Sequence, residues 1–166
     1  MSTRCPVIIR KYEVEDFETY YSLVSEDHVM KYITGKGLTK PEAQKKFAEI
    51  IEINKEEEEL GYFKVYTEKD VHIGDCKLER YERDKNWLEI GYILKESYWG
   101  QGYGSLICER MLLLADWVAP DADVIGIIDP QNEASKRLLE KFNFRSFFIG
   151  VEDDLPTEKL RLYRSK

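Results

Sequence analysis

Trp99-Gly100-Gln101-Gly102-Tyr103-Gly104-Ser105 is the stretch that decides the fold of this chain. It follows a strand-like segment, Trp87 to Leu94, and precedes a helix-like segment, Leu106 to Trp117. Glycines between a strand and a helix let the backbone approach a ligand, and the helix start offers unpaired N–H groups and the positive end of the helix dipole. The sequence therefore predicts that residues 100–105 bind a phosphate-bearing ligand.

The composition is typical of a globular protein. The chain has 166 residues, of which 43% are hydrophobic and 34% charged, and this length suits one domain spanning residues 1–166. No apolar run approaches the roughly 20 residues of a membrane span. The short apolar run after Pro6 does not resemble a signal peptide. We therefore expect a cytoplasmic protein with no membrane partner.

Charge and cysteine content narrow the function classes. A net charge of −7 argues against a nucleic-acid partner, because such proteins cluster Lys and Arg against phosphates. An acidic surface suits an amine-bearing substrate, and it equally serves to keep a cytoplasmic protein soluble. Cys5, Cys76 and Cys108 are far apart and odd in number, which predicts reduced thiols. His28 and His72 lack a ligand-like spacing to any Cys, so we expect no metal site.

Hydrophobic periodicity and turn residues predict the order of the elements. Strands are expected at 7–11, 62–67, 71–81, 87–94, 124–128, 147–151 and 159–163, and helices at 15–25, 27–33, 39–60 (closed by Gly61), 106–117 and 133–142. Short turns predict an antiparallel meander. The strand 124–128 is the most apolar, so it should be central and, after a helix, parallel to strand 87–94. We expect a mixed, mostly antiparallel sheet of six to seven strands with helices on both faces.

Two common phosphate-binding motifs fit the glycine stretch poorly. A P-loop has a Lys after its last glycine, and Ser105 stands there. A dinucleotide-binding turn has its third glycine one place later than Gly104 and follows a parallel strand, whereas antiparallel strands come first here. Asp121 and Asp123 lie near the distance of the ribose-binding acid, but they precede the next strand instead of ending it. A nucleotide-binding enzyme is kept only as an alternative.

Segments on both sides of the glycine stretch carry a family resemblance. They are Glu89-Ile90-Gly91-Tyr92-Ile93-Leu94, Tyr98 to Gly104, Asn132-Glu133-Ala134-Ser135 and Leu139-Glu140-Lys141-Phe142-Asn143-Phe144. In this order they resemble the GNAT family of acetyl-CoA-dependent N-acetyltransferases, nearest to its ribosomal-protein-alanine acetyltransferase (RimJ/RimL-like) branch. The resemblance is sharp from 87 to 144 and faint before 60. It implies an α/β (α+β) GNAT fold whose sheet splays between its fourth and fifth strands, 87–94 and 124–128.

The resemblance implies acetyl-CoA as the cofactor and a set of residues that hold it. The pyrophosphate would be wrapped by the backbone amides of Gly100, Gln101, Gly102, Tyr103, Gly104 and Ser105. The pantetheine arm would bond to the backbone of Ile93 and Leu94, as a peptide adds to a sheet edge. Asn132 and Ser135 would contact the arm near the thiol. The family commonly has Arg or Gln at the position of Trp99, so no side-chain phosphate contact is expected there.

Acetyl transfer to an amine needs a base, and the leaving thiolate needs a proton or hydrogen bond. Many family members use a Tyr seven residues after the Asn as the acid, but Leu139 stands there, and in the resembling branch a Ser at the position of Ser135 is the substitute. Ser135 is equally well interpreted as a helix-start residue that satisfies the backbone. Glu89 is the candidate base, with Glu79 second. The alternative for Glu89 is a strand carboxylate paired with a Lys or Arg across the sheet.

The remaining reactive side chains suggest direct transfer. Tyr92 and Tyr103 are interpreted chiefly as packing residues, and Cys108 as a small core residue without the surroundings of a nucleophile. We therefore expect direct acetyl transfer to a primary amine: a protein N-terminal α-amine, or a small polyamine, amino sugar or drug. A catalytically silent acyl-CoA-sensing module stays open because of Leu139, and so does a homo-oligomer.

Overall fold

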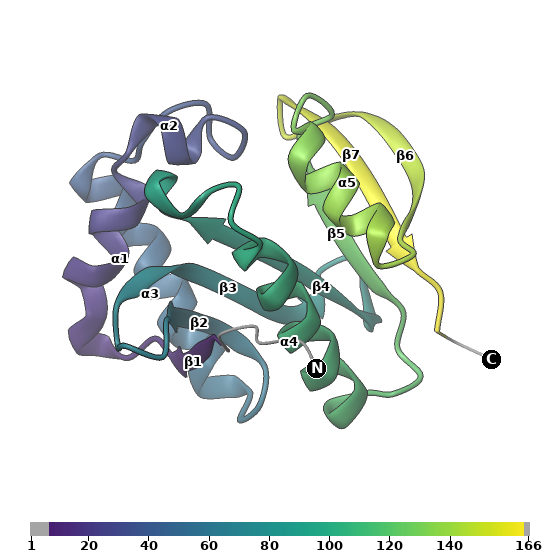
Figure 1. The fold of residues 1–166 in the computed structure, drawn as a ribbon, viewed down its shortest axis with the longest axis horizontal. Coiled ribbons are helices and arrows are strands. Elements are labelled where there is room, and N and C mark those ends of the chain that lie inside the picture. Colours follow the sequence, from purple (N-terminus) through teal and green to yellow (C-terminus); the bar gives the residue numbers. More distant parts are fainter. Residues whose placement is uncertain (1–6, 165–166) are drawn as a thin grey trace.

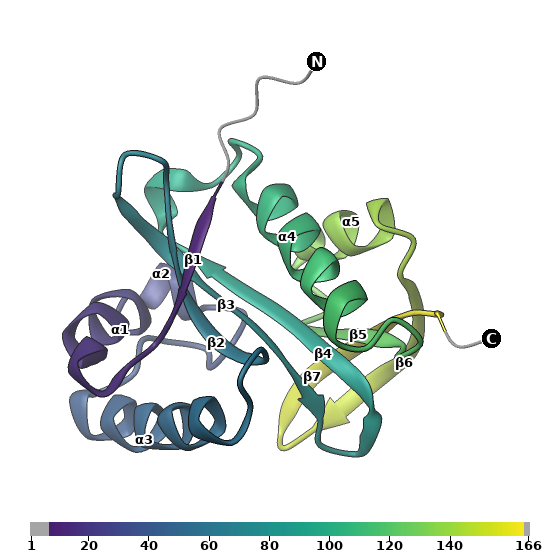
Figure 2. The ribbon, with the colours of Figure 1, turned by 90° about the horizontal axis from the view of Figure 1, so that it is seen from below.

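The computed structural model describes residues 7–164, which build one seven-stranded sheet with helices on both faces (Figures 1 and 2). The strands are β1 (Ile8–Lys11), β2 (Gly61–Tyr66), β3 (His72–Tyr81), β4 (Asp84–Leu94), β5 (Val124–Ile128), β6 (Arg145–Glu152) and β7 (Leu155–Leu162). Their order in the sheet is β1-β2-β3-β4-β5-β7-β6. Neighbouring strands are antiparallel except β4 and β5, which are parallel. The predicted mixed, mostly antiparallel sheet is confirmed.

The helices form two layers, each over its own hydrophobic core (Figure 2). One layer holds α1 (Phe17–Val24), α2 (Asp27–Met30) and α3 (Lys40–Glu56), and the other holds α4 (Tyr103–Val118) and α5 (Glu133–Lys141). Two short 3-10 turns, η1 (Val14–Asp16) and η2 (Glu96–Tyr98), precede α1 and the glycine stretch. α3 starts as predicted, because the side chains of Thr39 and Glu42 each accept the other's backbone N–H.

Gly61 belongs to β2 and does not close α3, so that prediction was wrong. α3 ends at Glu56, and Gly61 has φ +140 as the first residue of the strand. The Asn54 side chain bonds the backbone of Tyr12 and Tyr62 at 2.8–3.0 Å, which ties the helix to β1 and β2. A Cβ on Gly61 would stand 2.1 Å from the Asn54 oxygen. The glycine is therefore required by this close approach and not by a helix end.

Other boundaries also differ from the predictions: β4 begins at Asp84, before the predicted Trp87, and α2 ends at Met30. α4 begins at Tyr103, inside the glycine stretch, and not after it. The final hairpin is longer than predicted because β6 and β7 are joined by two residues, Asp153 and Asp154, with φ +51 and +63. Asp tolerates this left-handed conformation, but without a glycine the turn has a weak sequence signal.

β4 and β5 part after a short stretch of pairing. Only Leu88–Ile90 of β4 pair with residues 124–126 of β5, so residues 91–94 have no partner on that side. Val124 and Ile125 are fully buried, as predicted for a central strand, whereas Ile127 is 39% exposed. The parallel placement and the splay are thus confirmed, and the two halves of the sheet diverge beyond it (Figure 1).

The described thiols are free and buried. These are Cys76 and Cys108, and Cys5 lies outside the described residues. Within residues 7–164, no helix is long and apolar enough to cross a membrane.

Candidate active site

The glycine stretch forms the start of α4 at the mouth of the splay. Gly100 and Gly102 have φ +71 and +89, and no described atom lies within 4 Å of the place where a Cβ of either would stand. Gly102 is the N-cap of α4 and supplies no capping side chain. The N–H groups of Tyr103, Gly104 and Ser105 therefore begin a 16-residue helix with room for an anion in front of it.

Side chains of the stretch brace it from behind. The Trp99 indole Nε1 donates to the Leu94 carbonyl at 2.9 Å, and Gln101 Nε2 donates to the Ser97 carbonyl at 2.7 Å. The Gln101 side chain is thus turned onto η2, and its backbone is the part available to a ligand. These two hydrogen bonds anchor the loop to the end of β4 and to η2.

Lys141 was missed by the sequence analysis. It lies at the end of α5, and its Nζ donates to Ser105 Oγ at 3.2 Å. A cation therefore stands beside the start of α4, where an anion is favoured. The two residues are far apart in sequence, so no local signal could have joined them.

The open edge of β4 presents the peptide groups of Tyr92 and Leu94. The Leu88 N–H donates toward β5, whereas the Lys95 N–H donates toward β3. Consecutive residues of a strand direct their peptide groups to opposite edges, so those of Ile93 face β3. Since the Leu94 carbonyl is already bound by an indole, an extended arm laid in the splay would meet the backbone of Tyr92.

The Tyr92 side chain joins α4 and α5 on the face that these helices cover. Its hydroxyl lies 3.5 Å from Ser135 Oγ, and a Cβ on Gly104 would stand 3.2 Å from it. Burial raises the pKa of Tyr92, which keeps the phenol protonated at neutral pH. Asn132 Oδ1 caps α5 by accepting the Ser135 N–H at 3.2 Å. The cap is thus made by Asn132, while the Ser135 hydroxyl is directed toward β4.

Glu89 lies on the opposite face of β4 from the buried Ile90, as alternation predicts. Its Oε2 is 2.5 Å from Lys77 Nζ, so the cross-strand ion pair weighed in the sequence analysis is present. Glu79, the second candidate base, stands directly opposite Glu89 in the β3–β4 register. On the other side, Glu89 is paired with Ile125 of β5, one residue before the pairing of the two strands ends at Ile90.

Asp75 extends this charged row along β3, and the sequence analysis did not single it out. Asp75, Lys77 and Glu79 alternate on one face, which is the period-2 signal that could have found them. Asp75 is 5% exposed, and the Tyr12 hydroxyl donates to it at 3.3 Å. Burial raises the pKa of Asp75 to about 7.

Cys108 takes no part in the site. Its side chain is 2% exposed and lies on α4 in the hydrophobic core, and burial raises its pKa to about 12. A thiol that stays protonated at neutral pH is a poor nucleophile.

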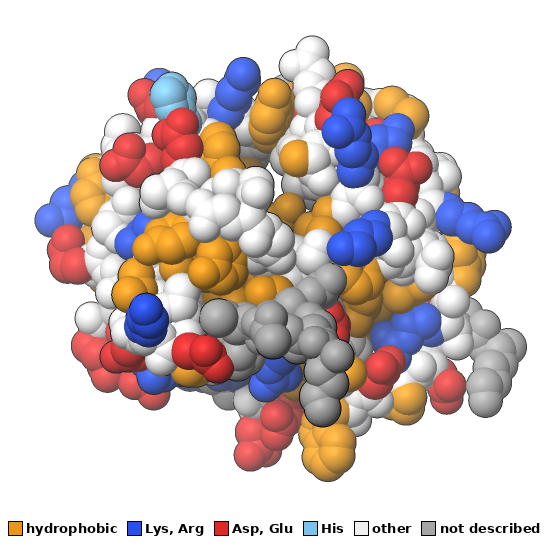
Figure 3. Space-filling view, viewed as in Figure 1, with side chains coloured by type: hydrophobic (Ala, Val, Ile, Leu, Met, Phe, Trp, Pro, Cys, Tyr) orange, Lys and Arg blue, Asp and Glu red, His pale blue; other side chains and the backbone are white. Residues whose placement is uncertain are grey.

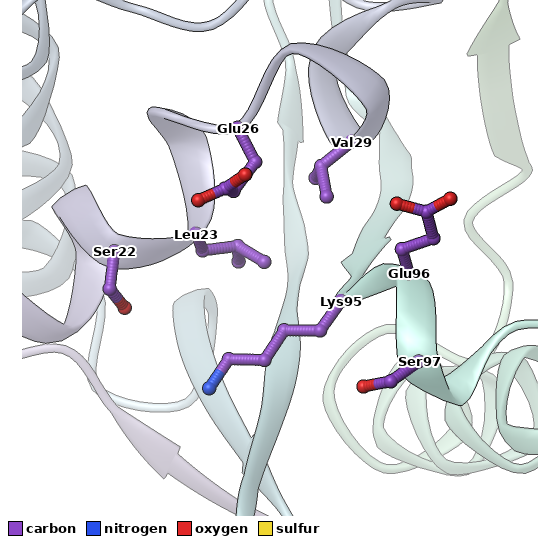
Figure 4. Close-up of a pocket in the computed structure, with 7 residues that line it drawn as sticks. All are labelled: Ser22, Leu23, Glu26, Val29, Lys95, Glu96 and Ser97. Atoms are coloured by element: carbon purple, nitrogen blue, oxygen red, sulfur yellow. The ribbon is translucent and has the colours of Figure 1, made fainter.

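A cavity of ≈ 500 Å³ lies beyond the end of β4, between the α1–α2 corner and η2. Carboxylates of Glu26 and Glu96 stand on opposite sides of it, and Lys95 extends across (Figure 4). Its lining also includes Ser22, Leu23, Val29 and Ser97. His28 Nδ1 is 3.1 Å from a Glu96 oxygen and links α2 to η2. In the space-filling view, hydrophobic side chains show in the hollow between this side and the α5 side (Figure 3).

A mostly antiparallel sheet that opens at one parallel pair, with a helix start facing the opening, defines the class as acetyltransferases of the GNAT type. Residues 7–145 match the family described as "Acetyltransferase (GNAT) domain". The chain belongs to this family and is an N-acetyltransferase enzyme.

Relatives and solved structures agree with this assignment. The chain is 27% identical over 158 residues to the N-acetyltransferase p20 of Bacillus licheniformis, itself uncharacterised, covering 93% of this chain and 86% of p20. Its fold matches spermidine N-acetyltransferase from Vibrio cholerae, solved with CoA and spermine (TM-score 0.76, 14% identity, 95% of each chain). It also matches yncA from Salmonella typhimurium, solved with its cofactor acetyl-CoA (TM-score 0.73, 16% identity, 96% and 95%). Neighbours with this fold therefore bind CoA and acetyl-CoA.

Proposed function

We propose that this chain is a cytoplasmic, single-domain enzyme that uses acetyl-CoA to acetylate a primary amine directly. The observation that carries the proposal is the parting of β4 and β5 beside the uncapped start of α4. The opening offers an unpaired strand edge for an amide-bearing arm, and the helix start offers N–H groups for a pyrophosphate. The pantetheine arm of CoA thus has a strand edge to pair with, and its pyrophosphate has a helix start to bind.

The cofactor contacts that we propose follow the geometry. Residues 100–105 bind the pyrophosphate through their backbone, with Lys141 adding positive charge. The arm bonds to peptide groups at the open edge, chiefly those of Tyr92, which lies next to the predicted contact Ile93. Asn132, whose oxygen caps α5, has amide N–H groups to offer to the arm.

The chemistry that we propose separates proton removal from proton donation. Acetyl-CoA supplies the acetyl group as a thioester. Glu89 takes a proton from the acceptor ammonium, directly or through water, so that a neutral amine can attack. Ser135, supported by the Tyr92 hydroxyl, supplies a hydrogen bond or proton to the departing sulfur. Because Glu89 and Tyr92 point to opposite faces of β4, acceptor and leaving group are handled on different sides of the sheet.

We propose a protein N-terminal α-amine as the acceptor, as in the RimJ/RimL-like branch that the sequence resembles. The cavity beyond β4 supports an amine-bearing group, because the Glu26 and Glu96 carboxylates on its sides outnumber the single ammonium of Lys95. A small amine would use the same carboxylates, so the acceptor class is decided by experiment.

The proposal is tested by CoA release from acetyl-CoA with a panel of peptides, polyamines and amino sugars. We expect release of free thiol with at least one amine, matched by an added acetyl group in mass spectrometry. A peptide of the same sequence with a blocked N-terminus is the control for α-amine transfer. Binding of CoA without thiol release from any amine would contradict the enzymatic proposal. Thermal stabilisation by NAD in preference to CoA would contradict the cofactor.

Gly102→Ala is expected to weaken CoA binding by about tenfold or more, which corresponds to about 1.4 kcal/mol. The added Cβ would enter the open space in front of α4 where the pyrophosphate is proposed to lie. Gly35→Ala is the matched control, because Gly35 also has φ +89 and open space around its Cβ position but lies in the loop before α3. Calorimetric titration with CoA should separate the two variants, and equal affinities would contradict the proposed pyrophosphate site.

A further inference from the structure

Lys77 extends from β3 over the neighbouring strand β4. It stands opposite Gly91 in the β3–β4 register, and Gly91 has no side chain to hold it away. Three stem carbons of Lys77 lie 3.1, 3.3 and 3.7 Å from the place where a Cβ of Gly91 would stand. The glycine thus lets the ammonium extend beyond its own strand.

The Lys77 ammonium lies between two carboxylates. Its Nζ is 2.5 Å from Glu89 Oε2 and 3.7 Å from Glu79 Oε2, and it is 5.6 Å from the centroid of the Tyr62 ring. The three charged side chains are only 15–24% exposed. Because solvent screens such a pair less than a surface pair, the ammonium acts strongly on both carboxylates.

Glu79 and Glu89 would face each other without a counter-charge if Lys77 were absent. Like charges directly opposite on neighbouring strands repel, and two carboxylates that share a site without a cation retain a proton. Burial alone would lower the pKa of Lys77, but the charges of Glu89 and Glu79 outweigh it, so its pKa lies above the ordinary value. The cation is therefore permanent over the working pH range of an enzyme.

The other ionisable groups around the pair do not replace this cation. Burial raises the pKa of Tyr62 on β2, which stays a neutral phenol. Asp75 is the next charged residue along β3, and the Lys46 Nζ on α3 lies 5.8 Å from the centroid of the Tyr62 ring.

On the β5 side, the register partner of Glu89 is Ile125, which is apolar. On β7, Arg161 is opposite Ile125 and is bound to Asp123, and Lys159 is bound to Glu152.

We infer that Lys77 is a positioning residue for acetyl transfer, whose ammonium keeps Glu89 ionised and fixes the direction of its carboxylate next to the point where β4 and β5 part. The inference rests on the proposed function, because it takes Glu89 as the base. A carboxylate that must accept a proton from the acceptor works only when it is ionised before the acceptor binds. Lys77 thereby extends the activity of the enzyme toward lower pH.

The pH profile of kcat/KM in the full chain tests this inference. For Lys77→Met we expect the acid limb to move up by about 1–2 pH units, with activity regained at high pH. Lys77→Arg should keep the parent profile, since the guanidinium preserves the charge. Glu79→Gln should move the limb to lower pH, because it removes the repelling carboxylate.

Lys64→Met is the matched control. Lys64 on β2 also forms an ion pair of low exposure, 2.7 Å from Asp16, with side chains 12% and 15% exposed. Lys64→Met should lower the free energy of urea unfolding by about as much as Lys77→Met does. It should leave the pH profile of kcat/KM unchanged.

A Lys77→Met profile parallel to the parent, or a Glu79→Gln limb that does not move down, would overturn the inference. If Glu89→Gln loses activity while Lys77→Met keeps the parent profile, only this inference fails. Full activity in Glu89→Gln would remove the proposed base as well.

Discussion

Glu89→Gln is expected to lower kcat/KM for the amine by about 10²–10⁴-fold, the usual contribution of a positioned base. The amide has nearly the size of the carboxylate but cannot accept a proton. Glu89 is the candidate that lies next to the point where β4 and β5 part, with a short ion pair that fixes its direction. The affinity for CoA should change little, because the backbone contacts proposed for the cofactor lie elsewhere.

The measurement is a steady-state assay at saturating acetyl-CoA, with calorimetric titration of CoA as the binding readout. Glu82→Gln is the control, because Glu82 is an exposed carboxylate at the β3–β4 turn. Unfolding in urea should be followed for each variant, since Lys77 loses its nearest counter-charge in Glu89→Gln. Activity within about threefold of the parent, in a folded protein, would show that Glu89 is not the base.

Asp75→Asn is expected to stabilise the protein above neutral pH by about 2–4 kcal/mol. Burial raises the folded-state pKa of Asp75 from its ordinary 3.8 to about 7. Below pH 3.8 both folded and unfolded chains hold the proton, so the carboxyl has no effect on the pH dependence. As the pH rises toward 7, the unfolded chain ionises first, and stability is progressively lost. Asn removes this loss and can still accept the Tyr12 hydrogen bond.

The check is the free energy of urea unfolding of parent and variant at several pH values from about 4.5 to about 8. The difference should be small at the acid end and grow to its full size above pH 7. Asp70→Asn is the control, because Asp70 is an exposed partner of Arg10 and should change stability by no more than about 0.5 kcal/mol. A difference that does not depend on pH would contradict the assignment of a protonated Asp75.

The sequence alone determined the features that depend on neighbouring residues. Hydrophobic periodicity identified the order of the strands and helices, and the glycine stretch between strand and helix predicted an anion site, which stays a prediction. The helix before Val124 required β5 to run parallel to β4, and this single parallel pair is where the sheet opens. Local signals failed at Gly61, because its φ and the contact with Asn54 depend on how α3 meets β2.

Only the tertiary structure decided which charges meet on this face of the sheet. Glu89 and Lys77 are placed together by the register of β3 on β4, and the missing side chain of Gly91 lets the ammonium cross. The ionisation of Asp75 depends on how deeply α1 and α3 bury it, and the cavity beyond β4 joins segments about 70 residues apart in the chain. Periodicity shows which side of a strand a residue occupies. Distances across strands and the depth of burial set the strength of an ion pair or a pKa, and these exist only in the folded chain.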